Sequence, residues 1–360
     1  MKILSRYLAK EIYSATAIIL IAFLGLFAFF DFVNELDSIG KDSYALHHAL
    51  IYVLMIMPGR VYELFPIAVL IGTLYALTTL ARHSEITVMR ASGMSSLNLL
   101  GNLTLIGSVF VILTFIFGEY IAPPAESAAQ QWRLTATNSA VSQQLRSGLW
   151  VRDGAMFINV RTIRPDRTME HIRIYQVDEN YKLVSISEAE QATYDNTEGK
   201  KQWRIENLTR IHFHPDRTER EQLPEMLWRS DLTPEVLSVL MVVPERMSVT
   251  NLWAYIRHLR ENQQDASRYE IALWKKILYP FAALVMMALA LPFALNHDRM
   301  GGVSVKVFLG VMLGIGFHLL NGLFSNLGVL NAWTPALVAI TPSLIFLSAA
   351  ILLLYVINRR

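Results

Sequence analysis

The sequence predicts an α+β membrane protein, with six transmembrane helices and an antiparallel β domain of jelly-roll type inserted between helices 3 and 4. The layout of the chain predicts this class. Long uncharged apolar stretches lie near both ends, and a polar region of about 150 residues separates them. Hydrophobic residues make up 53% of the 360 residues and charged ones 17%, which is typical of a membrane protein that also carries a soluble domain.

The apolar stretches account for six membrane-spanning helices. A bilayer has a hydrocarbon core about 30 Å thick, so one helix needs roughly 20 apolar residues. Four stretches suit one helix each, whereas the last has 52 residues and needs a break, which Asn326–Asn331 and Trp333-Thr-Pro335 favour. The stretches are Ile12–Phe30, Leu64–Ala81, Ala91–Gly118, Ile277–Asn296 and Val307–Asn358.

Two local features qualify this assignment. The apolar segment Leu46–Met57 is too short to cross the membrane, and we expect it to form an interfacial or partly inserted helix on the outer side. Pro58-Gly59 should separate that helix from the second span, because proline removes a helical hydrogen bond and clashes with the preceding turn. In the fifth span, Gly310 and Gly314 would let another helix approach closely.

Basic residues set the expected orientation, because they are enriched in cytoplasmic loops. On the opposite side, Lys41 is the only lysine or arginine in the connections at 34–48 and 326–333. We therefore expect both termini in the cytoplasm and the polar region outside. The residues that define the cytoplasmic side are Lys2, Arg6, Lys10, Arg82, Arg90, Arg299, Lys306, Arg359 and Arg360.

The polar region has the pattern of an antiparallel β domain. Asp153-Gly154 is a strong hairpin signal within Gly148–Val160, and His171–Val177 alternates polar with apolar residues. Many short strands in about 100 residues favour a sandwich or a jelly roll. We expect further strands at Leu183–Ser187, Gln191–Tyr194, Trp203–Ile205 and Arg210–His214, and a helix after the N-cap candidate Ser248. The expected domains are an N-terminal transmembrane half at 1–121, the β domain with flanking helices at 122–270 and a C-terminal transmembrane half at 271–360.

The residues offer no catalytic or cofactor motif. The chain lacks a phosphate-binding glycine loop, a His-Glu-x-x-His pair and a nucleophile elbow, so we expect a protein that is not an enzyme and has no cofactor of its own. A net charge of +2 gives no reason to expect nucleic acid. His212 and His214 lack a third ligand for a metal, and zero cysteines exclude disulfides and thiolate ligands.

The cytoplasmic segment at about 82–95 is short and amphipathic. Ile86, Met89 and Gly93 can share one helical face, while Arg82 and Glu85 project towards water. An ordinary basic interfacial loop would have no need of the carboxylate. The pattern is that of a coupling helix that docks on a cytosolic ATPase, for which the candidate contacts are Arg82, Glu85, Met89 and Arg90.

At this segment the chain resembles the LptF/LptG family, the permeases of the lipopolysaccharide export ABC transporter. Ser84–Gly93 is similar to that family's coupling-helix motif, and the likeness extends along the chain. Asp231–Leu237 and Gln264–Tyr269 resemble the G-type subunit more than its F-type paralogue. The other segments that carry the likeness are Arg6-Tyr-Leu, Glu119–Pro123 at the end of span three and Gly148–Gly154.

The resemblance implies a non-catalytic permease subunit in the bacterial inner membrane. It would form a heterodimer with the F-type permease, and two copies of a separate ATPase would bind ATP in the cytosol. Lipopolysaccharide would enter past the first and fifth spans and pass to bridge proteins through a β domain in the periplasm. The F-type paralogue of the same transporter and a polytopic sensor or scaffold without transport remain the alternatives.

The resemblance also suggests where lipopolysaccharide binds. Arg133 matches a basic family position, while Asp31 and Gln130 stand where relatives can carry a cation. The other outer-side cations are Arg60, Arg268, Lys275 and Lys276, each of which could instead be an interfacial anchor. Inside the β domain, an acyl-chain path would be lined by Trp150, Phe157, Ile174 and Trp203, with a sealed core as the alternative.

Overall fold

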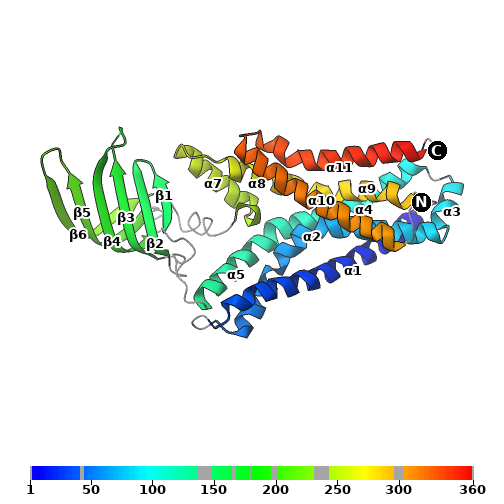
Figure 1. Ribbon diagram of the computed structural model, residues 1–360, viewed down its shortest axis with the longest axis horizontal. Coiled ribbons are helices and arrows are strands. Elements are labelled where there is room, and N and C mark those ends of the chain that lie inside the picture. Colours follow the sequence, from blue (N-terminus) through cyan, green and yellow to red (C-terminus); the bar gives the residue numbers. More distant parts are fainter. Residues whose placement is uncertain are drawn as a thin grey trace. The chain divides into compact units, whose positions relative to one another are not determined.

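The computed structural model describes residues 2–40, 44–93, 95–136, 148–163, 168–178, 180–195, 202–230, 243–295 and 303–358 (Figure 1). The chain packs as two compact units. The first, the helical unit, contains Met1–Asn34, Val53–Glu126 and Ser267–Arg360. The second, the β unit, contains Glu35–Tyr52 and Ser127–Ala266.

Six helical stretches among the described residues are long and apolar enough to cross a membrane, which confirms the predicted number. The first three are built from α1 (Lys2–Glu35), α2 (Leu46–Arg82) and α4 (Ser96–Ile116). The last three are built from α8 (Ser267–Leu278) with α9 (Ala282–Leu295), α10 (Val303–Leu330) and α11 (Pro335–Asn358). A 3-10 turn, η6 (Tyr279–Phe281), joins α8 to α9, and α11 begins at the predicted proline.

Two expected helix ends are wrong. Pro58 does not break the chain, because α2 runs unbroken through both Pro58 and Pro66. A proline removes only one backbone donor, and neighbouring helices in a membrane protein can hold such a helix together. Span three does not close near Glu119 either. It continues through a π-helical turn, η2 (Phe117–Ile121), into α5 (Ala122–Ala136).

Small residues bring the helices of the helical unit close together. A Cβ atom on Gly72 of α2 would lie 2.7 Å from the backbone nitrogen of Thr16 on α1. Gly310 and Gly314 of α10 face Leu74 and Ile67 of α2 in the same way. The glycine spacing noticed in the sequence therefore serves packing within this chain. Both chain ends and α3 (Glu85–Ala91) lie at one end of the helical unit (Figure 1).

The six described strands of the β unit form one antiparallel sheet in sequence order. This confirms the antiparallel β domain, but the described strands make a single up-and-down sheet, whereas a sandwich or jelly roll has two. The strands are β1 (Leu149–Asp153), β2 (Met156–Ile163), β3 (Met169–Val177), β4 (Leu183–Asp195), β5 (Gln202–Phe213) and β6 (Thr218–Arg229). The two short strands expected at 183–187 and 191–194 form one long strand, β4. The two expected at 203–205 and 210–214 likewise belong to one long strand, β5.

Alternation of buried residues changes phase in the middle of the sheet. In β5, Leu208 is buried, yet the next buried residues are Ile205 and Trp203, an odd number of positions away. Asn207 lies between them with a φ of 52°, and His171 of β3 has a φ of 51° on the same row of the sheet. These left-handed residues turn the strand over locally, so that both halves of the sheet contribute to one core.

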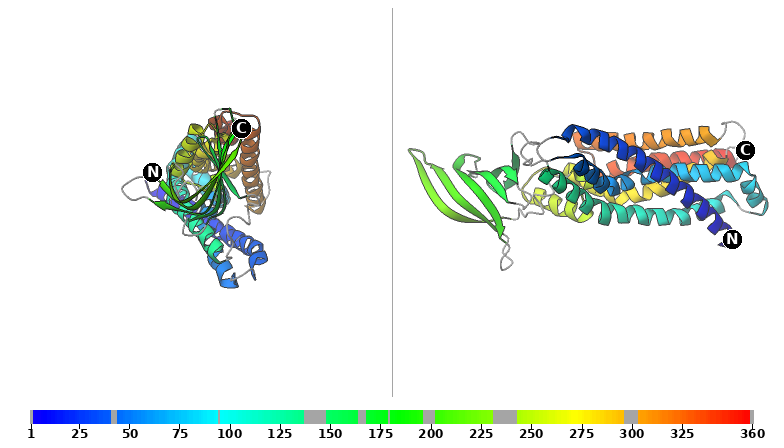
Figure 2. Two further views of the ribbon diagram at one scale, coloured as in Figure 1. Left: turned by 90° about the vertical axis from the view of Figure 1, so that its left-hand side faces the viewer. Right: turned by 90° about the horizontal axis from the view of Figure 1, so that it is seen from below.

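The sheet is strongly twisted (Figure 2). A hydrogen bond links the end of its first strand to the residue that follows its last strand. The Ser230 hydroxyl, just after β6, donates to the Asp153 carboxylate at the end of β1 at 2.5 Å. This curling encloses the apolar face and leaves Trp203 fully buried. A short 3-10 turn, η5 (Pro244–Arg246), precedes α7 (Val249–Glu261), whose predicted N-cap Ser248 accepts from the Asn251 backbone at 3.2 Å.

Candidate functional site

The segment expected to couple to an ATPase forms a short helix, α3, at the end of α2. Ser84 takes a left-handed φ of 61° after Arg82, and Gly93 does the same with 91° after α3, so the chain turns sharply on both sides. Ile86 and Met89 are buried in the core of the helical unit. A helix held by two core side chains must follow any shift of the helices beneath it.

The candidate ATPase contacts occupy different environments. Arg82 is exposed and Glu85 is half-buried, with the Tyr7 hydroxyl of α1 as a hydrogen-bond partner. Met89 is only 8% exposed, so it anchors α3 and does not offer a surface contact. Val88 is 63% exposed on the opposite face and was missed by the sequence reasoning. Arg90 belongs to α3, but its side chain lies outside the described residues.

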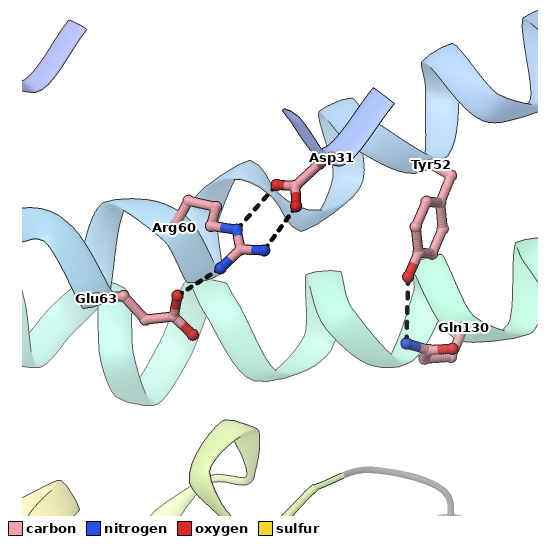
Figure 3. Close-up of polar contacts among 5 residues, drawn as sticks. All are labelled: Asp31, Tyr52, Arg60, Glu63 and Gln130. Carbon is pink, nitrogen blue, oxygen red and sulfur yellow. Dashed lines mark hydrogen bonds and ion pairs between the residues drawn. The ribbon is translucent and has the colours of Figure 1, made fainter. Parts of the chain in front are cut away.

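Arg60, one of the candidate headgroup cations, is held by two carboxylates (Figure 3). Its Nε and Nη2 atoms donate to the two carboxylate oxygens of Asp31 at 2.9 and 2.6 Å. Its Nη1 atom donates to Glu63 at 2.8 Å, one turn along α2. The three formal charges therefore sum to −1, although Arg60 was expected to act as a headgroup cation. Asp31, which the resemblance had marked as a family cation position, is in this chain the carboxylate partner of Arg60.

The network joins two helices through a geometry that only arginine provides. Asp31 lies on α1 and Arg60 on α2, and the guanidinium meets the carboxylate as a two-pronged fork. The Asp31 side chain is 11% exposed and that of Arg60 21%, so both are mostly withdrawn from the surface of the unit. The Arg60 guanidinium also lies 5.6 Å from the centre of the Phe27 ring of α1.

Arg133 has an acidic partner inside the β unit. Its Nε atom lies 2.9 Å from a carboxylate oxygen of Glu35, which is buried, and its Nη2 atom donates to Ser38 at 3.3 Å. The guanidinium also lies 5.5 Å from the centre of the Tyr52 ring. Nearby, burial and the Glu35 carboxylate raise the pKa of Tyr44. Arg133 is thus engaged with the 35–52 segment, which sequence reasoning missed because Glu35 lies at the end of an apolar helix.

Gln130, a second position compared with the family, also faces this segment. Its side-chain amide donates to the Tyr52 hydroxyl at 3.5 Å (Figure 3). In the same stretch, the Trp132 indole donates to the backbone oxygen of His48 at 3.3 Å. These contacts, with the Arg133–Glu35 pair, bind α5 to the start of α2 within the β unit.

The remaining candidate cations differ in how deeply their side chains are buried. Arg268 is exposed, and Lys275 donates to Ser325 of α10 at 2.9 Å. Lys276 is only 6% exposed, and its ammonium lies 4.6 Å from the centre of the Tyr62 ring. This places Lys276 inside the helix bundle rather than at an interface as a snorkelling anchor, a location that its charge alone does not indicate.

Two of the four residues expected on an acyl-chain path lie in the apolar core of the sheet. Ile174 is 3% exposed and Trp203 is fully buried. The expectation that Trp150 and Phe157 point inward is wrong. Trp150 is 52% exposed and stacks on Tyr175 at 5.5 Å between ring centres, and Phe157 pairs with Tyr175 across the strands on that same outer face. Side chains alternate along a strand, so the buried Val151 and Ile158 occupy the inner face instead.

The two strand histidines pair with acids across the sheet. His212 of β5 lies 3.7 Å from Glu221 of β6, and His214, just after β5, lies 3.6 Å from Glu219 of β6. Within the described ranges, no group of three or more acidic, histidine or cysteine side chains could hold a metal ion.

Comparison with known sequences shows which protein family has this architecture. A sequence profile of the lipopolysaccharide export system permeases LptF/LptG matches residues 6–356. This chain belongs to the LptF/LptG family. The chain is also 31% identical over 353 residues to the lipopolysaccharide export system permease protein LptG of Escherichia coli K12, with 98% of each protein covered. It is 30% identical over 344 residues to LptG of Haemophilus influenzae, with 96% of each covered.

Membership of the LptF/LptG family agrees with the architecture. The family consists of permeases, so this chain is a transporter component, and its six apolar helices make it a multi-pass inner-membrane protein. The antiparallel sheet inserted between the third and fourth spans completes the predicted fold class.

Proposed function

We propose that this chain is the LptG-type permease subunit of an ABC transporter that extracts lipopolysaccharide from the inner membrane. The observation that carries the proposal is the LptF/LptG match over nearly the whole chain, together with LptG relatives at 30–31% identity. The subunit couples ATP hydrolysis to lipid movement, and ATP is bound by the partner ATPase.

In this proposal α3 is the coupling helix. Two copies of a cytosolic ATPase bind beneath this chain and an F-type permease, and α3 transmits their closure to the spans. The burial of Ile86 and Met89 supports this role, because it links α3 to the helical core. Glu85 and Arg82 then provide the polar contacts, and Val88 provides an exposed apolar one. Both termini lie in the cytoplasm, at the same end of the helical unit as α3.

The β unit extends into the periplasm in this proposal and passes lipid to bridge proteins. Its enclosed apolar face, which includes Ile174 and Trp203, has the chemistry that acyl chains require. Near the membrane surface, Arg60, Arg133 and Lys275 are the cations available to lipid A phosphates. Each already has a polar partner in this structure, so substrate must compete for it.

Substituting Glu85 tests the proposed function. A charge pair at an interface can contribute several kcal/mol, so Glu85→Lys should weaken ATPase association about tenfold or more. ATP-dependent release of lipopolysaccharide from proteoliposomes should fall in parallel. Thr87→Lys is the matched control, since it adds a lysine to an exposed position of α3 without reversing the carboxylate. Unchanged ATPase binding and lipid release in Glu85→Lys would contradict the coupling role.

A further inference from the structure

The two halves of α1 are held very differently. Its first half contributes Leu8, Ile12, Ala15 and Thr16 to the interior of the helical unit. Residues 17–34 are all described, and none of their side chains is buried. The boundary between the halves is the close crossing of Thr16 and Gly72, where the backbones of α1 and α2 approach. Beyond Leu20, which still packs against the core, residues 21–34 of α1 contribute no side chain to it.

The Asp31–Arg60 fork lies fifteen residues beyond this crossing. It supplies two charge-assisted hydrogen bonds between the unpacked half of α1 and α2. The other carboxylate on Arg60, Glu63, comes from α2 itself and does not hold α1. Glu35, the last residue of α1, pairs with Arg133 of α5 and not with α2, so removing the Asp31 contact would loosen α1 from α2 ahead of Glu35, whereas removing Glu63 would not.

The chemistry of the fork allows one anion to replace another. A guanidinium offers five N–H donors in a plane, and it matches a phosphate as well as it matches a carboxylate. A phosphate group carries more negative charge than a carboxylate. The Arg60 side chain keeps 21% of its surface exposed, so it is not sealed inside the unit.

We propose that Arg60 is an anion-exchange site, at which a phosphate group of the lipid headgroup displaces Asp31 and releases the second half of α1 from α2. This inference rests on the proposed lipid substrate. Asp31 is then a specificity-determining residue, because an incoming headgroup must bind Arg60 more strongly than the Asp31 carboxylate does. Lipids without a phosphate leave the fork closed. Glu63 stays on Arg60, since both lie on one helix a single turn apart.

Spin-label distances can test the exchange. The chain has no cysteine, so two introduced cysteines label it uniquely. Phe30→Cys on α1 and Leu54→Cys on α2 report on the outer half, and both positions are exposed. Ser14→Cys with Tyr75→Cys reports on the region before the crossing. The full-length chain would be studied in dodecyl maltoside, which contains no phosphate.

Three ligands and two variants separate the outcomes. Diphosphoryl lipid A should lengthen the outer distance, while dephosphorylated lipid A should not. Asp31→Asn should lengthen it without any ligand and tighten binding of diphosphoryl lipid A by roughly threefold to tenfold. Glu63→Gln, the matched control, should keep the short distance. The Ser14–Tyr75 distance should stay constant throughout, which shows that the variants remain folded.

Other results would overturn the inference or change the source of the phosphate. Inorganic phosphate that lengthens the distance as well as lipid A does would support exchange at Arg60 and assign it to free phosphate. An unchanged outer distance in Asp31→Asn would overturn the proposal that the Asp31–Arg60 pair holds α1 against α2, as would an equal response to dephosphorylated lipid A. A normal response with no ATP-dependent lipid release from proteoliposomes would instead count against the proposed function alone.

Discussion

The first two spans, α1 and α2, are nearly equal in length and composition but not in surroundings. They have 34 and 37 residues, and both are apolar enough to cross a membrane. Yet 6% of the most apolar window of α1 is buried within the chain, against 83% for α2. Hydropathy measures whether a helix tolerates an apolar medium. It does not distinguish lipid from protein as the neighbour, because both are apolar.

The contacts of α2 explain its position. Helix α10 approaches it through Gly310 and Gly314, and α1 crosses it at Gly72. The Tyr279 hydroxyl donates to the backbone oxygen of Glu63 at 2.6 Å, which fixes the 3-10 turn against α2. By contrast, α1 keeps large side chains exposed along its second half, namely Ile18, Ile21, Leu26, Phe29 and Phe30.

The largest expected effect comes from filling the α1–α2 crossing. Gly72→Leu would place a side chain where a Cβ alone lies 2.7 Å from the Thr16 backbone, so the helices must separate. Overpacking against side chains typically costs about 1–3 kcal/mol, but here the obstacle is backbone, which cannot move aside as a side chain does, so the cost should exceed the ~2–5 kcal/mol of a core truncation. We expect a strong loss of folded protein and of thermal stability in detergent. Gly25→Leu on α1, with no neighbouring atom within 4 Å, is the control and should behave as wild type. If Gly72→Leu and Gly25→Leu left stability equally unchanged, α2 would not be more tightly packed than α1 at these sites.

A smaller effect should follow from removing the same side chain on each helix. Leu77 of α2 is fully buried, so Leu77→Ala leaves a cavity and should cost about 2–5 kcal/mol. Leu26 of α1 is 49% exposed, and Leu26→Ala should change stability by less than about 0.5 kcal/mol. Equilibrium unfolding in mixed detergent would measure both values. Similar losses in the two variants would mean that α1 is packed as firmly as α2.

The smallest expected effect concerns the polar link between the helices. Arg60→Lys keeps the charge but replaces the planar fork with a point charge, so it cannot bind both Asp31 oxygens in the same way. We expect a loss of about 0.5–1 kcal/mol, since the pair is partly exposed. Arg82→Lys, at the exposed end of α2, should have no effect. A melting temperature for Arg60→Lys equal to that of Arg82→Lys would show that the fork adds nothing to the α1–α2 contact.

Sequence patterns predicted which helices and strands form better than they predicted where those elements begin and end. The six spans, the Asp153-Gly154 hairpin and the Ser248 cap all follow from local rules on hydropathy, turns and hydrogen bonding. The strand β6 was missed because its residues are mostly polar and exposed, as at the edge of a sheet, and because it contains Pro224. The unbroken α2 was missed because the proline rule describes an isolated helix and ignores neighbours.

The candidate site was predictable in its residue types but not in its pairing. Arg60 and Arg133 were recognised as cations near the membrane surface. Their partners Asp31, Glu35 and Glu63 depend on how helices pack, which no spacing along the chain reveals. The inward direction of Trp150 and Phe157 was wrong because hydrophobicity identifies residues suited to a core without giving the phase of the strand.

The sequence by itself determined that the chain spans a membrane six times and carries an antiparallel sheet, because both follow from local periodicity and the thickness of lipid. It also determined the family, through motifs that extend along the chain. Only the tertiary structure decided which apolar helix is enclosed, which face of each strand is inside and which carboxylate holds each arginine. Those outcomes depend on contacts between residues far apart in the chain, where close packing and paired charges select one arrangement among many compatible with the same pattern.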